Sequence, residues 1–138
     1  MELRSCINYL LTTAQHEVNQ EISTRLKDFE LTPAQYGVLN YLWENTVATP
    51  KELAHMLQVE NSTMSGILDR LQKKGLIERR TDENDRRSVQ VMLTPEADTL
   101  KADVLNSVSE MNTEVLSSID AEKREMFMDC LRTIGHVE

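Results

Sequence analysis

Residues 61–94 read NSTMSGILDRLQKKGLIERRTDENDRRSVQVMLT, and the spacing of apolar residues changes partway along this stretch. In its first part, apolar residues recur at steps of three or four, which predicts the buried face of an α-helix. These residues are Met64, Ile67, Leu68 and Leu71. Asn61 or Ser62 is suited to cap the start of this helix, and Gly75 is suited to end it in a left-handed conformation.

The second part has the two-residue period of β-strands. Residues 76–80 and 88–93 alternate, with four apolar side chains expected on one face: Ile77, Val89, Val91 and Leu93. The segment between them, 81–87, is rich in Asp and Asn, which favour turns. We therefore predict a β-hairpin directly after the helix.

Upstream and downstream of this stretch, each of the three prolines follows a threonine, at 32–33, 49–50 and 94–95. Proline suits the first position of a helix, and a preceding threonine can cap the free amides. Gln35 and Glu52 stand three residues after their threonines, at capping-box spacing. The sequence therefore predicts a helix from Pro33 to about Asn45, a short helix over 50–57, and a third helix beginning at Pro95.

Both ends of the chain carry long amphipathic patterns. An apolar stripe predicts one helix over about 3–28: Leu3, Ile7, Leu10, Ala14, Val18, Ile22 and Leu26. A similar stripe continues from Pro95 to Ile119, and a last helix after Asp120 is expected to turn three residues inward: Phe127, Leu131 and Ile134. The expected fold is mostly α with a small β-hairpin.

Composition narrows the class of protein. A chain of 138 residues suits one domain, or a small domain with helical extensions. No apolar run is long enough for a membrane span or a signal peptide, so we expect a soluble, cytoplasmic protein. Cys6 and Cys130 lie far apart, which indicates neither a disulfide framework nor a zinc site, and no cofactor motif is present.

Charge is distributed unevenly. The chain carries a formal charge of −8, yet residues 51–93 have a net charge of +1 and the remainder has −9. Since exposed charges are screened beyond about 8 Å at physiological salt, the acidic ends do not cancel a local cationic surface. A short helix, a turn, a second helix and an arginine-flanked hairpin form the order of a winged helix-turn-helix, which places a helix in the DNA major groove and a β-loop in the minor groove.

The run from Glu52 to Thr94 closely resembles the MarR family of bacterial transcription regulators. The family's DRLxxKGLIxR segment stands at 69–79, and its DxRR wing, followed by a strand and LT, stands at 85–94. Ala97 departs from the glycine that members often have after the LTxx turn, which should affect only the local start of that helix. The resemblance implies a homodimer that binds one palindromic site on double-stranded DNA.

The resemblance also implies three regions: an N-terminal dimerization helix over 1–30, a winged helix-turn-helix over 31–94, and C-terminal dimerization helices over 95–138. Elementary physics agrees with a dimer. Long apolar stripes attached at both ends of a small domain cannot all be buried against that domain, and large exposed apolar patches are unusual in monomers. A partner related by twofold symmetry resolves the excess.

Candidate DNA contacts fall on the second helix and the wing. Short polar residues at the helix start allow close approach to bases and phosphates: Asn61, Ser62, Thr63, Ser65 and Gly66. Arg70 is placed to reach a guanine or a phosphate, and its alternative is an exposed surface pair with Asp69 or Lys74. Lys51 and Lys73 are placed to contact the DNA backbone, and their alternative is an ordinary solvated surface. The resemblance assigns Arg86 to the minor groove; Arg80 and Arg87 suit phosphates or bracing of the hairpin, and Asp85 suits acceptance of hydrogen bonds within the wing.

Regulators that resemble this chain often release DNA when a small aromatic or anionic effector binds between the dimerization helices and the winged domain. Polar or aromatic residues on those elements are candidates to line such a pocket: His16, Arg25, Tyr36 and Trp43. For each of them ordinary packing or a surface position is the alternative. Repression is the commoner mode among similar proteins.

Two other functions are compatible with the sequence. Some relatives sense organic hydroperoxides through an early cysteine, and Cys6 is early, but no basic or phenolic partner for it is evident. A winged helix that binds protein is the second alternative. An enzyme is not expected, because the chain has no phosphate-binding glycine loop, no HExxH motif and no convincing Ser, His and Asp set.

Overall fold

The computed structural model describes residues 1–138 as a mainly helical chain with one small sheet. The α-helices are α1 (Ile7–Leu26), α2 (Pro33–Asn45), α3 (Pro50–Leu57), α4 (Asn61–Lys73), α5 (Pro95–Leu116) and α6 (Arg124–Gly135). The strands are β1 (Val47–Ala48), β2 (Ile77–Thr81) and β3 (Val89–Leu93), and short 3-10 turns cover Leu3–Ser5, Lys27–Phe29 and Ala121–Lys123.

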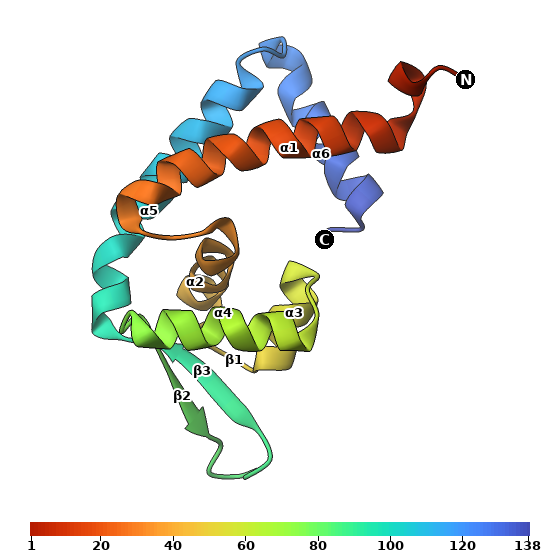
Figure 1. The fold of residues 1–138 in the computed structure, drawn as a ribbon. Coiled ribbons are helices and arrows are strands. Elements are labelled where there is room, and N and C mark those ends of the chain that lie inside the picture. Colours follow the sequence, from red (N-terminus) through yellow and green to blue (C-terminus); the bar gives the residue numbers. More distant parts are fainter.

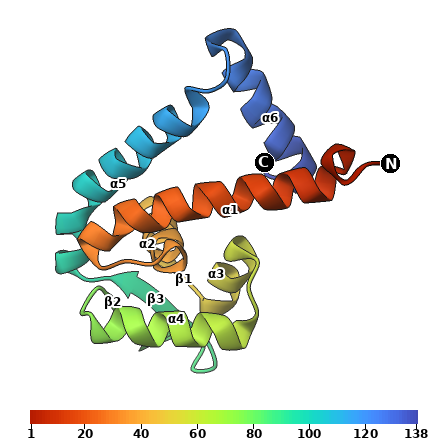
Figure 2. The ribbon, with the colours of Figure 1, turned by 45° about the horizontal axis from the view of Figure 1, so that its top comes forward.

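The elements form two groups (Figures 1 and 2). Helices α2, α3 and α4 pack together with the sheet into what we call the winged lobe, residues 33–93. Helices α1, α5 and α6 form an open frame beside it, and α1 packs along α5. The β2–β3 hairpin projects from the winged lobe away from α1 and α6, so its tip is free to meet another molecule (Figure 1).

The predicted helix starts are confirmed. Thr32 and Thr49 each accept a hydrogen bond from the third helical amide, and the Gln35 and Glu52 side chains complete both capping boxes. Thr94 accepts from the amide of Ala97 at 3.4 Å, so alanine fits where relatives often have glycine. These caps satisfy backbone donors that the helices leave free.

Gly75 ends α4 as expected. Its φ is +76°, its amide donates to Gln72 at 2.9 Å, and the next amide, of Leu76, donates to Leu71 at 3.1 Å. This pair of bonds is a Schellman motif, which needs a left-handed residue. The motif turns the chain directly from α4 into the hairpin.

The sheet has one strand more than the predicted hairpin, with the order β1-β3-β2. The hairpin strands begin one residue later than expected. Val89, which was expected on the same face as Val91, is exposed, whereas Val91 is fully buried. The added strand β1 pairs with β3 through Val47 opposite Met92 and Ala48 opposite Val91. Two residues are too few to show a strand period, which is why the sequence did not indicate β1.

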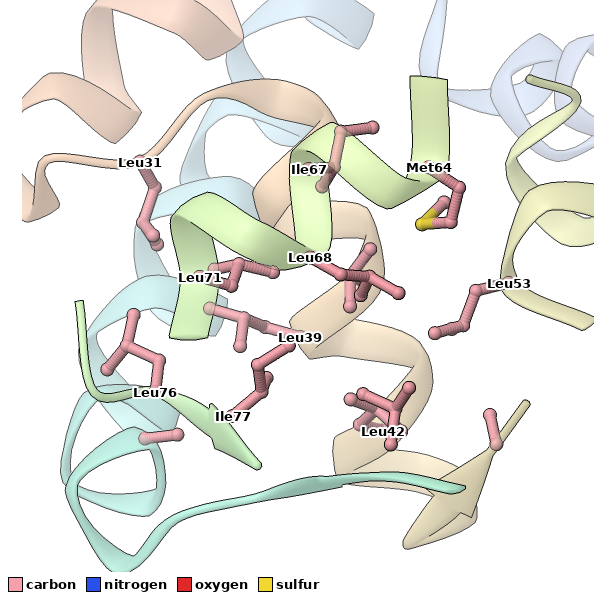
Figure 3. Packing of buried hydrophobic residues seen from close by; sticks show 14 of the residues in the cluster. Leu31, Leu39, Leu42, Leu53, Met64, Ile67, Leu68, Leu71, Leu76 and Ile77 are labelled. Carbon is pink, nitrogen blue, oxygen red and sulfur yellow. The ribbon is translucent and has the colours of Figure 1, made fainter. Parts of the chain in front are cut away.

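The core lies inside the winged lobe and along its contact with α5 and the end of α1. In Figure 3, Met64, Ile67, Leu68 and Leu71 line the face of α4 that packs towards α2 and the first strand of the hairpin. The predicted apolar face of α4 is therefore correct. Because this stripe is buried, the opposite, polar face of α4 is left to solvent.

The terminal helices depart from expectation. The first predicted helix is interrupted at Cys6, which is extended, and only its C-terminal part packs on the core, through Val18, Ile22 and Leu26. Its earlier apolar residues are exposed: Leu3 by 63%, Ile7 by 61% and Leu10 by 50%. The prediction that α6 turns apolar residues inward is wrong for the protomer, because Phe127, Leu131 and Ile134 are exposed and α6 has no buried residue.

No helix of the structure combines the length and the apolar character needed to cross a lipid bilayer.

Candidate nucleic-acid interface

Helix α4 presents a polar face next to the wing. Asn61, Ser62, Thr63 and Ser65 are exposed in its first turns, and Gly66 is half-buried. Around the Gly66 Cα, no atom lies within 4 Å of the place that a Cβ would occupy. The start of α4 is therefore lined by small groups that leave room for a close external partner.

The predicted cap of α4 is wrong. The N-cap residue is Glu60, one position before Asn61, and its side chain makes no capping hydrogen bond. Helices α2 and α3 of the same lobe are both capped by threonine. The first-turn amides of α4 thus have no side-chain acceptor in the protomer, and such free amides at the positive end of the helix dipole favour an anion.

Two aspartates shape the wing loop. Asp85 accepts a hydrogen bond from the Arg87 amide at Oδ1, at 3.0 Å, and its carbonyl accepts from the Ser88 amide at 2.9 Å. Asp82 accepts from the Asn84 amide at 2.9 Å. Asp85 therefore orders the loop, as its position suggested, whereas Asp82 was not singled out from the sequence; its place just after the strand, two residues before Asn84, is the signal of an Asx turn.

Seven of the eight lysines and arginines of the lobe fall into two classes, and the eighth, Lys74, donates hydrogen bonds without forming an ion pair. Arg79 and Arg80 form ion pairs, with Asp69 at 2.7 Å and with Glu78 at 2.8 Å. Five exposed cations form no ion pair and no side-chain hydrogen bond: Lys51, Arg70, Lys73, Arg86 and Arg87. Arg80 therefore braces its own strand in the protomer. The alternative that Arg70 pairs with Asp69 is wrong, because Asp69 pairs with Arg79 instead.

A second brace, which the sequence did not single out, joins the wing to α4. The Arg79 guanidinium donates from Nε to Gln72 and from a terminal nitrogen to Asp69, both at 2.7 Å. Asp69 and Gln72 are one helical turn apart, so they share a face of α4. Asp69 and Arg79 both stand in the 69–79 motif, which is the sequence signal that could have indicated this ion pair, but only the fold brings them together. They line a shallow polar depression that also includes Lys73.

The four candidate effector residues are not joined to one another by any hydrogen bond or ion pair. His16 is exposed on α1, where Gln20 lies 3.2 Å from its Nε2. Tyr36 and Trp43 are half-buried on α2; the Tyr36 hydroxyl accepts from Asn40 at 2.7 Å, and the buried Nε1 of Trp43 has no acceptor.

Arg25 is engaged within the chain. Its guanidinium pairs with Glu114 at 2.6 Å and with Glu110 at 3.4 Å, and so ties α1 to α5. The hydrogen bond that Arg25 donates to Glu114 raises the pKa of Arg25 above its ordinary value, against partial desolvation, and the charges of Glu114 and Glu110 raise it further. Arg25 therefore stays charged, and it can meet an effector only by giving up a carboxylate.

Other site types have little support in the geometry. No group of three or more His, Cys, Asp or Glu side chains is placed to hold a metal ion. Cys6 is half-buried and Cys130 exposed, both as free thiols. The Cys6 side chain makes no hydrogen bond with a tyrosine or a basic residue.

Residues 31–89 match the model of the MarR family. The chain is 32% identical over 101 residues to the organic hydroperoxide resistance transcriptional regulator of Bacillus subtilis (strain 168), covering 73% of this chain and 69% of that protein. Its fold matches the transcriptional repressor CouR bound to a 23-mer DNA duplex with a TM-score of 0.91, at 28% identity, over 97% of this chain and 95% of that one.

A cysteine-to-serine variant of MarR from Escherichia coli, complexed with operator DNA, matches with a TM-score of 0.85 at 25% identity, over 93% of this chain and 92% of that one.

Proposed function

The chain belongs to the MarR family of winged helix-turn-helix, DNA-binding transcriptional regulators, which are not enzymes, and from this premise we propose that it acts as a homodimeric repressor on a palindromic operator. In each protomer α4 enters the major groove and the wing enters the minor groove. The division of labour we propose is dimerization by residues 1–30 and 95–138, and DNA binding by residues 31–94.

The observation that carries the proposal is the set of five unpaired cations on α3, α4 and the wing. An exposed arginine that has no carboxylate partner keeps its full attraction for phosphate, and it gives up no ion pair on binding. The uncapped start of α4 adds free amides to these cations. Together these groups form a surface suited to a polyanion in a chain that is acidic elsewhere.

Within that surface we assign Arg86 to the minor groove and Arg87, Arg70, Lys51 and Lys73 to phosphates or base edges. A guanidinium on a narrow loop suits the negative potential of a narrow minor groove. The hydrogen bonds that Asp85 accepts hold the loop in shape. Arg80 can join the phosphate contacts only if Glu78 releases it.

A second copy would cover the exposed apolar faces of the terminal helices. Leu3, Ile7 and Leu10 at one end of the chain, and Phe127 and Ile134 at the other, present apolar area that the protomer leaves in water. A twofold partner would bury these faces and set two recognition helices about one DNA turn, roughly 34 Å, apart.

The experiment that tests the proposal begins with selection of bound sequences from a random duplex library. Arg86→Ala should weaken binding to the selected operator by about 1 to 3 kcal/mol per protomer site. The melting temperature should not change, because the exposed Arg86 side chain forms no ion pair and no hydrogen bond. Lys101→Ala, on the exposed side of α5, removes the same charge and serves as the control. Equal affinities for the Arg86 variant and the wild type would disprove the assignment of the wing.

Salt dependence separates this function from a winged helix that binds protein. The logarithm of the DNA association constant should fall steeply and linearly with the logarithm of the salt concentration, because phosphate contacts release condensed counterions. An affinity insensitive to salt would favour the protein-binding alternative.

We further propose that a small aromatic or anionic effector binds between α1, α5 and α2 and releases the operator. His16, Tyr36 and Trp43 are the residues free to meet it, and the donor on Trp43 lacks an acceptor. Release follows if the effector prefers a spacing of the two lobes that does not fit DNA. Since Trp43 is the single tryptophan, a screen of phenolic and carboxylic compounds that never changes its fluorescence would contradict this site.

The second candidate function is a redox role for Cys6, because the similar Bacillus subtilis protein is named as a regulator of organic hydroperoxide resistance. The absence of a polar partner at the Cys6 sulfur weighs against it. We expect peroxide treatment to leave operator affinity unchanged, and a loss of affinity that Cys6→Ser abolishes would favour the redox function.

A further inference from the structure

Lys74, the C-cap of α4, reaches from the recognition helix to the junction between α1 and α2. Its ammonium donates to the backbone carbonyl of Glu30 and to Oε1 of Gln35, the latter at 3.0 Å. The neighbouring Lys73, in contrast, has no hydrogen-bond partner. Lys74 therefore belongs to the framework of the lobe and not to the set of unpaired cations.

Both acceptors are held in place by other contacts. Glu30 has a left-handed backbone, with φ 57°, and the next amide, of Leu31, donates back to Leu26 at 3.1 Å. Gln35 is only 4% exposed, and its Oε1 also accepts from the Thr32 amide at 3.2 Å. The ammonium thus meets the C-terminal end of α1 with its 3-10 extension, the N-terminal end of α2 and the C-terminal end of α4.

These two hydrogen bonds, both donated by Lys74, are the only ones between α4 and the α1–α2 junction. Apart from the Arg79 brace to β2, α4 packs in the lobe through apolar residues such as Leu68 and Leu71. Apolar burial is non-directional and allows small rotations, whereas a hydrogen bond requires a narrow range of distance and angle. The positive charge also lies at a carbonyl end of a helix, where the dipole favours it.

We propose that Lys74 is a positioning residue that fixes the recognition helix relative to α1 and thereby sets the operator half-site spacing that the dimer accepts. This inference rests on the proposed homodimer. In a twofold dimer, α1 belongs to the fixed centre, so a rotation of α4 against α1 changes the separation of the two recognition helices on both sides at once.

The test uses the full chain and three duplexes: one half-site, the selected palindrome, and the palindrome with one base pair inserted at its centre. The variant is Lys74→Met, which keeps an unbranched side chain, one atom shorter, and removes the charged donor. Lys101→Met, on the exposed face of α5, makes the same change where the lysine has no partner. Gln35→Met removes the buried acceptor without changing any charge.

For wild type and Lys101→Met we expect strong discrimination against the inserted base pair. For Lys74→Met, half-site affinity should stay within about twofold, affinity for the palindrome should fall about tenfold, and the penalty for the insertion should shrink about fivefold or more, a range typical of coupling between sites. Gln35→Met should show the same pattern, and the double variant should show little further loss, because both changes remove the hydrogen bond that Lys74 donates to Gln35.

The outcomes distinguish the two hypotheses. If the wild type discriminates spacing and Lys74→Met discriminates equally well, the positioning role is wrong while the proposed function stands. If Lys74→Met weakens half-site and palindrome alike, Lys74 contacts DNA and the inference fails. If the wild type binds no palindrome, the proposed function fails and the inference fails with it.

Discussion

At the scale of single residues, Gly66 has no reason within the protomer to be glycine. It lies in the middle of α4, with helical geometry and open space where a Cβ would stand. Glycine in a helix interior costs about 0.8 to 1.0 kcal/mol relative to alanine. A cost without an internal benefit is expected where another molecule approaches the backbone closely.

We therefore expect Gly66→Ala to stabilise the protein and weaken the operator complex. The melting temperature should rise by about 3 °C, since an increase of about 1 kcal/mol in the free energy of unfolding raises the melting temperature of a chain of this size by a few degrees. Thermal unfolding and operator titration give the two readouts. Gly135→Ala in α6, where the new Cβ would meet only Val137 at 3.6 Å, is the control that should not weaken DNA binding. A variant more stable than wild type that binds the operator equally well would show that Gly66 does not face DNA.

Residue-scale expectations succeeded where the interaction is local. The two capping boxes and the loop role of Asp85 depend on residues within three positions, and the sequence predicts them. The proposed cap of α4 failed because Asn61 and Ser62 are both good cap residues, and their identity does not fix where the helix begins. The chain starts α4 after Glu60 instead.

At the scale of elements, the position of the wing depends on the Arg79 brace. The Asp69 partner is more than half exposed, with a side-chain exposure of 54%. Exposed ion pairs are usually worth less than about 1 kcal/mol, so the brace should matter little for global stability. Its consequence is geometric, because it joins strand β2 to the recognition helix.

We expect Arg79→Met to lower operator affinity without changing the salt dependence of binding, because Arg79 is already held by Asp69 and Gln72. Arg80→Met is the comparison: if Arg80 leaves Glu78 for a phosphate, its loss should reduce the logarithmic salt slope by about one per protomer. Operator titrations at several salt concentrations measure both. A reduced slope for Arg79→Met would mean that Arg79 itself contacts DNA.

Element-scale expectations succeeded where a period is long enough to read. The helices of the winged lobe and the two hairpin strands follow their apolar spacing. Strand β1 was not predicted because its two residues are too few to show a strand period. Its pairing with β3 also follows a change of chain direction at Thr46, which has a positive φ of 67° after the end of α2. Positive φ is unusual for a β-branched residue, so a bend at this threonine could not be predicted from the sequence.

At the scale of the whole molecule, the frame of α1, α5 and α6 leaves much apolar surface in water. Apolar residues at both ends of the chain stand in water in the protomer, and α6 buries none of its residues. Surfaces of this kind mark an interface. The stability of the frame should therefore depend on protein concentration.

We expect Leu10→Asp, at a site 50% exposed in the protomer, to convert the dimer to monomer, because burial of an unpaired carboxylate in an apolar interface is costly. Sedimentation velocity measures the change. Val89→Asp places the same charge on an exposed apolar residue of the wing and should leave the dimer intact. A fully dimeric Leu10→Asp protein would exclude this part of α1 from the interface.

The sequence by itself determined where α2 and α3 begin, which face of α4 is apolar, and that a cationic hairpin follows α4. These features depend on neighbours a few residues apart, whose preferences are short-ranged. Only the tertiary structure decided which arginines are paired, that Lys74 joins α4 to the α1–α2 junction, and that the apolar faces of α1 and α6 remain open. An apolar stripe requires burial but carries no record of its partner, and an ion pair forms only between groups that the fold brings within a few ångströms.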